Sequence, residues 1–245
     1  MNFNTHTNVK DIVMAEPRAK RVFEDAGVDF CCGGGKSLHD ACLEAGAPAE
    51  EILERLRESS EAAPPEDAGW ASAPLGELTR HIREQHHRYV REASKRLRAL
   101  AEKVRGKHGE NHRELAEIEQ LFLEVAGEMS MHMQKEEMIL FPYIEAIEQA
   151  AKGGVTLEPP FFQTVQNPIH LMMKEHDAAG DLLKRIRKAS GDYAAPADGC
   201  TSYQTLYQEL REFEADLHEH VHLENNILFP RAMELEAKAF GRAGA

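Results

Sequence analysis

The sequence has few cysteines, little positive charge and no long hydrophobic run. Four cysteines in 245 residues are too few for a disulfide framework. No stretch approaches the roughly 18 apolar residues of a membrane span, and the N-terminus lacks the basic region and apolar run of a signal peptide. Lys and Arg total 29 against 42 Asp and Glu, which gives a formal net charge of −13. Nucleic acids and membrane surfaces attract basic faces, so we expect neither as a partner, and we expect a reduced, cytoplasmic protein.

A polar, proline-containing stretch divides the chain. Residues 59–73 are interpreted as a linker because small, charged and proline residues replace any apolar period there. Residues 1–58 carry three short helical patterns, near residues 9–26, 38–43 and 49–57, and are predicted to form a small helical domain. A unit of this size has a small core, so we expect it to pack against a partner or against the rest of the chain.

The remainder of the chain is predicted to be a helical bundle. Apolar residues recur every three or four positions in four long segments, near residues 75–104, 115–143, 169–188 and 202–239. No strand pattern is evident. Residues 74–245 are therefore predicted to form a four-helix up-down bundle, and the fold class is all-α.

An internal repeat is the most informative feature. Residues 132–142, HMQKEEMILFP, match residues 220–230, HVHLENNILFP, at an offset of 88. Each copy places a His-x-x-x-Glu pair on the apolar stripe of its helix: His132 with Glu136, and His220 with Glu224. A carboxylate on a buried face is costly unless it is paired or binds a metal. Because the pair occurs twice at equivalent positions, we predict a metal site.

The first and third helical segments add one histidine each. An offset of 89 aligns residues 95–98, KRLR, with residues 184–187, KRIR, and pairs His87 with His176. The apolar stripe of the first helix favours the adjacent His86, but the repeat selects His87, which we choose. A single ion cannot easily use four imidazoles and two carboxylates. Two ions that share the two carboxylates can. Such ligands with open positions favour iron over zinc, and we predict a non-haem centre with two Fe ions.

At these residues the chain resembles a known family. The helical part resembles the hemerythrin-like domains, with MMKEHD at residues 172–177, and GVDFCCGG at residues 27–34 resembles the N-terminal domain of the iron–sulfur cluster repair di-iron proteins. The resemblance implies an oxo- or hydroxo-bridged di-iron centre. It implies these iron ligands: His87, His132, Glu136, His176, His220 and Glu224.

The resemblance also implies a function. It indicates the repair of iron–sulfur clusters damaged by nitrosative or oxidative stress, with damaged iron–sulfur proteins as partners. The centre would bind or reduce nitric oxide or donate iron, and whether this makes the chain an enzyme stays open. The alternative is a hemerythrin-like protein that binds or senses dioxygen or nitric oxide. A structural bundle with buried ion pairs is a third interpretation, and a homodimer is compatible with the small N-terminal unit.

The cysteines divide into an adjacent pair and two single residues. A disulfide between the neighbouring residues Cys31 and Cys32 is strained, so we do not expect a structural bridge. We expect these thiols to take part in redox chemistry, to contact iron or a cluster fragment, or to contact a client. Cys42 and Cys200 have no evident partner and are expected to be inert.

Polar residues near the predicted ligands carry further expectations. Glu128 lies one turn before His132 and Glu175 adjoins His176, so both are candidates to contact the ligand histidines or to line a proton path. His218 and His222 lie off the apolar stripe of the fourth helix, and we expect them on the solvated surface.

Overall fold

The computed structural model describes residues 3–31, 33–59, 69–153 and 157–243. Cys32, most of the predicted linker and the chain ends lie outside these residues. Within the described part the chain is helical, and its only bridge of the β type joins Asn8 to Ser37.

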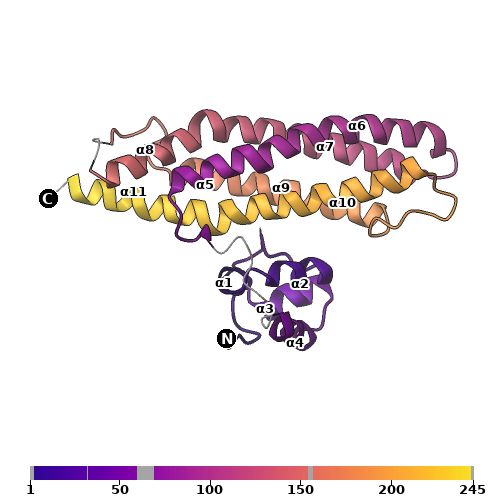
Figure 1. Cartoon of the computed structure of the whole chain (residues 1–245), viewed down its shortest axis with the longest axis horizontal. Coiled ribbons are helices and arrows are strands. Elements are labelled where there is room, and N and C mark those ends of the chain that lie inside the picture. Colours follow the sequence, from indigo (N-terminus) through magenta and orange to yellow (C-terminus); the bar gives the residue numbers. More distant parts are fainter. Residues whose placement is uncertain (1–2, 32, 60–68, 154–156, 244–245) are drawn as a thin grey trace.

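Four long helical arms run side by side as an up-down bundle, as predicted (Figure 1). The first arm comprises α5 (Leu75–Ile82), η2 (Arg83–His87) and α6 (Arg88–His108). The second comprises α7 (Glu114–Lys135), η3 (Glu136–Leu140) and α8 (Phe141–Ala151). The third is α9 (Gln166–Ala189). The fourth comprises α10 (Thr201–His222), η4 (Leu223–Leu228) and α11 (Phe229–Ala243).

The segments labelled η are π-helical turns inside three of the arms. Such turns insert an extra residue into the helical hydrogen-bond pattern and are frequent at functional sites. Pro142 and Pro230 each follow a π-helical segment as the second residue of the next α-helix. The proline rings, which lack an N–H donor, therefore fall where the hydrogen-bond register changes rather than inside a regular helix.

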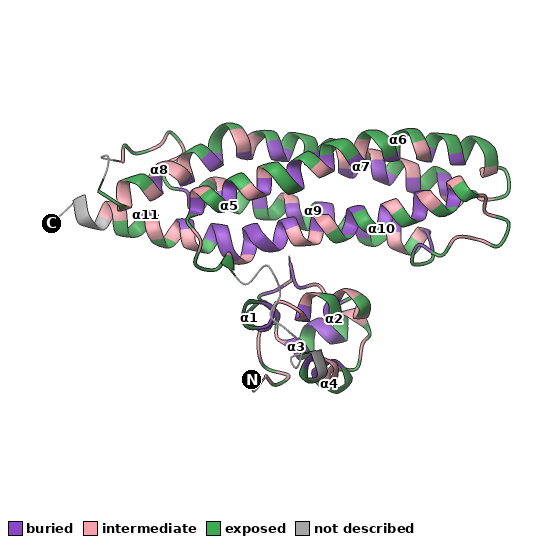
Figure 2. Cartoon of the chain, viewed as in Figure 1, coloured by how far each residue is buried: buried purple, intermediate pink, exposed green. Residues whose placement is uncertain are grey.

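Buried apolar residues line the facing sides of the arms (Figure 2). They form two clusters. One cluster packs residues of α6, α7, α9 and α10, and includes Leu97 and Phe122. The other packs residues of α5, α8, α9 and α11, and includes Ile82 and Phe229. The bundle is therefore apolar towards both ends, and the predicted ligand positions fall between the two clusters.

The small N-terminal unit, residues 3–59, contains α1 (Val9–Ala15), α2 (Ala19–Ala26), α3 (Leu38–Ala45) and α4 (Ala49–Ser59). The sequence pattern at residues 9–26 suggested one helix, and this is wrong. Pro17 separates two helices because it cannot donate the backbone bond that would continue α1. Gly27, at φ 67°, ends α2 in the left-handed region, which glycine adopts without strain.

The small unit lies beside the fourth arm, as its size led us to expect (Figure 1). Its buried apolar residues form one cluster with those of the bundle. Lys20 Nζ lies 2.8 Å from a Glu219 carboxylate oxygen. A Cβ on Gly34 would lie 2.7 Å from the Phe30 carbonyl oxygen, so glycine is what allows this loop to fold back on itself.

The expected solvent exposure of His218 and His222 is wrong. His222 is 3% exposed and His218 is partly buried. The Phe30 ring of the small unit packs edge-on against both imidazoles, at centroid distances of 6.1 Å and 5.8 Å. The helical stripe marks only the face that meets the other arms, whereas these residues are covered by a different part of the chain.

Candidate metal centre

Six side chains from all four arms meet midway along the bundle. They are 0–1% exposed. They are His87 at the end of η2, His132 on α7, Glu136 at the start of η3, His176 on α9, His220 on α10 and Glu224 in η4.

The six residues divide into two sets of four that share both carboxylates. Within each set, one ligand atom from every residue lies within 4.8 Å of the others. One set contains His87 and His220, and the other contains His132 and His176. Glu136 and Glu224 belong to both sets, so each carboxylate lies where it could bridge two ions.

Each carboxylate faces one histidine from its own arm and one from another. Glu136 Oε1 lies 3.3 Å from His132 Nε2, and Glu136 Oε2 lies 3.4 Å from His87 Nε2. Glu224 lies 3.1 Å from both His220 Nε2 and His176 Nε2. The i, i+4 spacing on the second and fourth arms therefore brings imidazole and carboxylate to a common point.

Several buried atoms in the pocket lack hydrogen bonds. Both carboxylate oxygens of Glu136, Oε2 of Glu224 and Nε2 of His87 are buried without a hydrogen-bond partner in the described residues. The Nε2 atoms of His132 and His176 are 2.9 Å apart. Unsatisfied buried polar atoms are costly, and two imidazole nitrogens come this close only with a proton or a cation between them. The residues therefore fit a site for cations.

The electrostatics of the pocket also favour positive charge. Burial lowers the pKa of His132, but the charge of Glu136 and hydrogen bonds to carboxylates outweigh it and raise the pKa to about 10. Burial raises the pKa of Glu224, but the opposing charge of His220 and the hydrogen bond with it hold the pKa well below its ordinary value. The carboxylates thus stay ionised in the protein interior and attract positive charge.

Comparisons with known proteins match both parts of the chain. The family model "Hemerythrin HHE cation binding domain" matches residues 78–232, a range that contains all six clustered residues. The "Domain of Unknown function (DUF542)" matches residues 5–60. The chain belongs to the hemerythrin HHE family.

Relatives align over nearly the whole chain. The chain is 35% identical over 227 residues to "Iron-sulfur cluster repair protein YtfE" of Musicola paradisiaca, covering 93% of this chain and 96% of that protein. It is 34% identical over 230 residues to the "Probable iron-sulfur cluster repair protein" of Haemophilus influenzae, covering 92% and 96%. It is 34% identical over 223 residues to YtfE of Enterobacter sp., covering 91% and 94%. The resemblance to the iron–sulfur cluster repair di-iron family is thereby confirmed.

The outer nitrogens of three clustered histidines have hydrogen-bond partners. His87 Nδ1 lies 2.7 Å from Glu137 Oε1, which also accepts from Arg91. His132 Nδ1 lies 2.9 Å from Glu175 Oε2, and Glu175 also accepts from Lys135. An acceptor at Nδ1 keeps a proton there, so that Nε2 is the nitrogen available to a cation in the pocket.

Asn225 supports the third histidine and links it to the small unit. Its Oδ1 lies 2.9 Å from His176 Nδ1, and its Nδ2 donates to the Cys31 carbonyl oxygen at 3.3 Å. Sequence reasoning missed both Glu137 and Asn225. The repeat holds a signal for them, since the offset of 88 pairs these two residues as it pairs Glu136 with Glu224.

The other residues proposed near the pocket have different surroundings. Glu175 contacts His132, as described, but Glu128 is exposed and no described contact joins it to the six residues. His86, the rejected alternative to His87, lies 3.0 Å from Asp216 Oδ1 and belongs to neither set.

The described cysteines lie in three different environments. Cys31 is buried, and its thiol lies 3.4 Å from Asp29 Oδ1. Cys42 is also buried, and burial raises the pKa of its thiol. Cys200 precedes α10, and a hydrogen bond with His108 lowers its pKa to about 7. The expectation that Cys200 is inert did not take His108 into account, because 92 residues separate the two in sequence.

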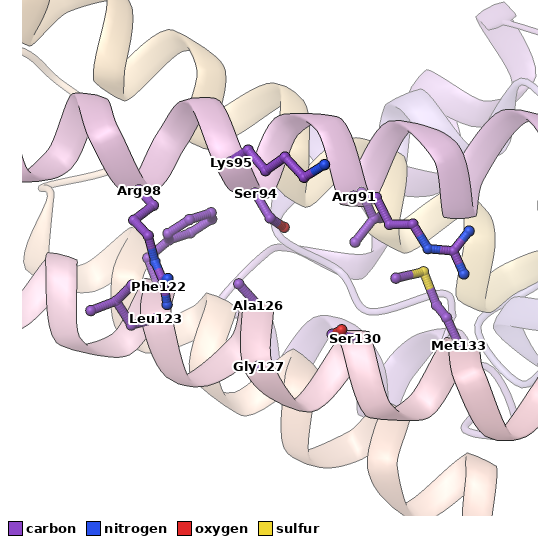
Figure 3. Close-up of a pocket in the computed structure, with 11 residues that line it drawn as sticks. Arg91, Ser94, Lys95, Arg98, Phe122, Leu123, Ala126, Gly127, Ser130 and Met133 are labelled. Carbon is purple, nitrogen blue, oxygen red and sulfur yellow. The ribbon is translucent and has the colours of Figure 1, made fainter.

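A groove of about 470 Å³ lies between α6 and α7, outside the buried cluster (Figure 3). Arg91, Lys95 and Arg98 line one side, and Ala126 and Gly127 line the other. None of the six clustered residues lines it. Among the described residues, no helix has the length and apolar character of a membrane span.

Proposed function

We propose that this chain is an iron–sulfur cluster repair protein whose bundle holds two iron ions. The observation that carries the proposal is the sharing of Glu136 and Glu224 by two buried four-residue sets. Imidazole and carboxylate ligands suit iron, and the related proteins described above are named for iron–sulfur cluster repair.

We assign the ligands as the six clustered residues, with Glu136 and Glu224 bridging. Two histidines and two shared carboxylates for each ion leave positions open. A pair of iron ions would supply redox-active positions there for a small diatomic ligand such as nitric oxide or dioxygen, with an oxo or hydroxo bridge between the ions. Glu137, Glu175 and Asn225 hold the Nδ1 protons of the ligand histidines, and the apolar clusters at both ends keep bulk water away.

We further propose that the two parts of the chain act together on damaged iron–sulfur proteins. Residues 1–58 would present Cys31 and Cys32 to the client. Residues 74–245 would take up nitric oxide from the damaged cluster or donate iron to the cluster. With two electrons from an external donor and two protons, they would reduce two nitric oxide molecules to nitrous oxide and water. The position of Cys31 supports this division, since its carbonyl contacts a residue that also contacts His176.

The test begins with metal content. Full-length protein purified without oxygen and given Fe²⁺ is expected to retain about two iron ions per chain, by the count of ligand sets. Iron well below one ion per chain, with no other metal, would overturn the proposal.

The repair role is tested with a purified [4Fe–4S] protein damaged by nitric oxide. In the presence of sulfide and a thiol reductant, addition of the iron-loaded chain is expected to restore the cluster absorbance, whereas addition of the metal-free chain is not. Electron paramagnetic resonance and gas analysis of the same mixture distinguish a nitrosyl product from nitrous oxide. Reversible dioxygen or nitric oxide binding without any restoration would instead favour the carrier or sensor function.

A further inference from the structure

Asn225 connects the backbone of the small unit to a clustered histidine. The residue is 8% exposed and lies in η4, directly after Glu224. One end of its amide lies 2.9 Å from His176 Nδ1, and the other donates to the Cys31 carbonyl oxygen at 3.3 Å. The amide thus spans the boundary between the small unit and the bundle.

The Cys31 carbonyl determines which way this amide points. A carbonyl oxygen can only accept, so the NH₂ group of Asn225 must face it. The amide oxygen then faces His176 and can only accept from Nδ1, which must carry the proton. In the neutral imidazole, which is the form that binds a metal, His176 Nε2 then carries no proton and points at the pocket, 3.1 Å from Glu224 Oε2. A backbone group of the small unit therefore selects the tautomer of His176.

The internal repeat shows why an amide stands here. At the equivalent position the first copy has Glu137, whose carboxylate faces His87 and the Arg91 guanidinium. A carboxylate suits a donor on both sides. Asn225 has a donor, His176, on one side and an acceptor, the Cys31 carbonyl, on the other, and a carboxylate would repel that carbonyl.

We propose that Asn225 is a positioning residue through which the Cys31 carbonyl of the small unit orients His176. The inference rests on the proposed function, because it takes His176 as a metal ligand. It assigns the small unit a second task besides client contact, which is to complete the support of the ion held by His132 and His176. The ion held by His87 and His220 receives its support within the bundle, from Glu137.

Asn226 provides a matched control. Its Nδ2 donates to the Phe30 carbonyl oxygen at 3.1 Å, so it also holds the small unit, and it lies 2.9 Å from His222 Nδ1. It contacts none of the six clustered residues in the described part of the chain. Substitutions at the two neighbouring asparagines therefore separate loss of docking contacts from loss of support for His176.

The experiment compares four full-length proteins: wild type, Asn225→Leu, Asn225→Asp and Asn226→Leu. Each is loaded with ⁵⁷Fe²⁺ without oxygen. Iron affinity is measured by competition with a chromogenic chelator, the two iron environments by Mössbauer spectroscopy, and docking by hydrogen exchange in residues 19–31. Circular dichroism checks that each variant keeps its helix content.

Asn225→Leu is expected to lower the affinity for one of the two iron ions by about 10–100-fold, the usual effect of losing a group that orients a ligand histidine. It should alter one Mössbauer doublet and leave the other unchanged. Asn226→Leu should speed hydrogen exchange in residues 19–31 and leave both doublets as in the wild type. Asn225→Asp should keep iron affinity within about threefold, since its carboxylate still accepts from His176, yet speed the exchange because it repels the Cys31 carbonyl.

Three outcomes would overturn the inference. Wild-type affinity and both wild-type doublets in Asn225→Leu would show that Asn225 does not position His176. Equal loss of iron in Asn226→Leu would assign the effect to docking in general. Unchanged hydrogen exchange in Asn225→Asp would refute the orientation argument. If the wild type itself binds no iron, the proposed function fails as well, so the two failures are distinguishable.

Discussion

Replacing Glu136 by glutamine tests the shared-carboxylate arrangement most directly. Glu136 is 0% exposed and belongs to both four-residue sets, whereas His87 belongs to one. Loss of a bridging ligand affects both ions, while loss of a terminal ligand affects one. Glu136→Gln is therefore expected to reduce metal content from about two ions per chain to well below one, and His87→Ala to about one.

The same substitution is expected to abolish stabilisation by metal. A free metal concentration of 100 times the dissociation constant stabilises the folded state by about 2.7 kcal/mol for each site. In a chain of 245 residues, 1 kcal/mol shifts the melting temperature by roughly 2–4 °C. With two sites, metal at that concentration should then raise the melting temperature of the wild type by about 11–22 °C, and that of Glu136→Gln by close to nothing.

The assay is differential scanning calorimetry of metal-free protein with and without added Fe²⁺, combined with elemental analysis. Glu128→Gln is the control, since Glu128 lies on the same helix but is exposed. Retention of one tightly bound ion by Glu136→Gln, with a wild-type thermal shift, would refute the bridging role. If the Glu128→Gln control loses as much bound metal as Glu136→Gln, then the change in charge alone, rather than the loss of a ligand, explains the lost metal binding.

Three further predictions concern other parts of the chain. Leu97 is 0% exposed in the bundle core, so Leu97→Ala should lower the free energy of unfolding in denaturant by about 2–5 kcal/mol. A parallel loss of iron would contradict a purely apolar role for Leu97. Burial and the charge of Glu219 raise the pKa of Glu24 from 4.5 to about 7. The neutral acid is therefore favoured in the fold, and stability is lost as the pH rises through about 7, so Glu24→Gln should melt higher than the wild type at pH 8 but not at pH 4. An equal difference in melting temperature between Glu24→Gln and the wild type at pH 4 and pH 8 would contradict the raised pKa of Glu24. The hydrogen bond from His108 lowers the pKa of Cys200 to about 7, so alkylation of Cys200, followed by mass spectrometry, should rise with a midpoint near that pH, and His108→Gln should move the midpoint upward.

How much could be predicted from sequence differs between the bundle and its surroundings. The helices depend on an apolar period among near neighbours, so residues 74–245 were predicted as a four-helix bundle, and the fold is confirmed. The repeat also resolved His87 from His86, which the helical stripe of one arm could not do. In the structure His87 joins the cluster, and His86 contacts Asp216 instead.

The errors arise where distant segments meet. His218 and His222 read as surface residues because a helical wheel shows only one helix, yet Phe30 covers them. The pairing of Cys200 with His108 likewise depends on packing between α6 and the start of α10.

Local sequence patterns were enough to predict the helical fold and the six residues that gather in its centre, because i, i+4 spacing and a repeat place side chains on a stripe without knowledge of the partner helices. The sharing of Glu136 and Glu224 between two sets became visible in three dimensions alone, since it depends on distances across four arms. Only the tertiary structure decided that Asn225 faces both His176 and Cys31. A hydrogen bond is made over about 3 Å, and no local pattern specifies which residues, 49 or 194 positions apart, come within that reach.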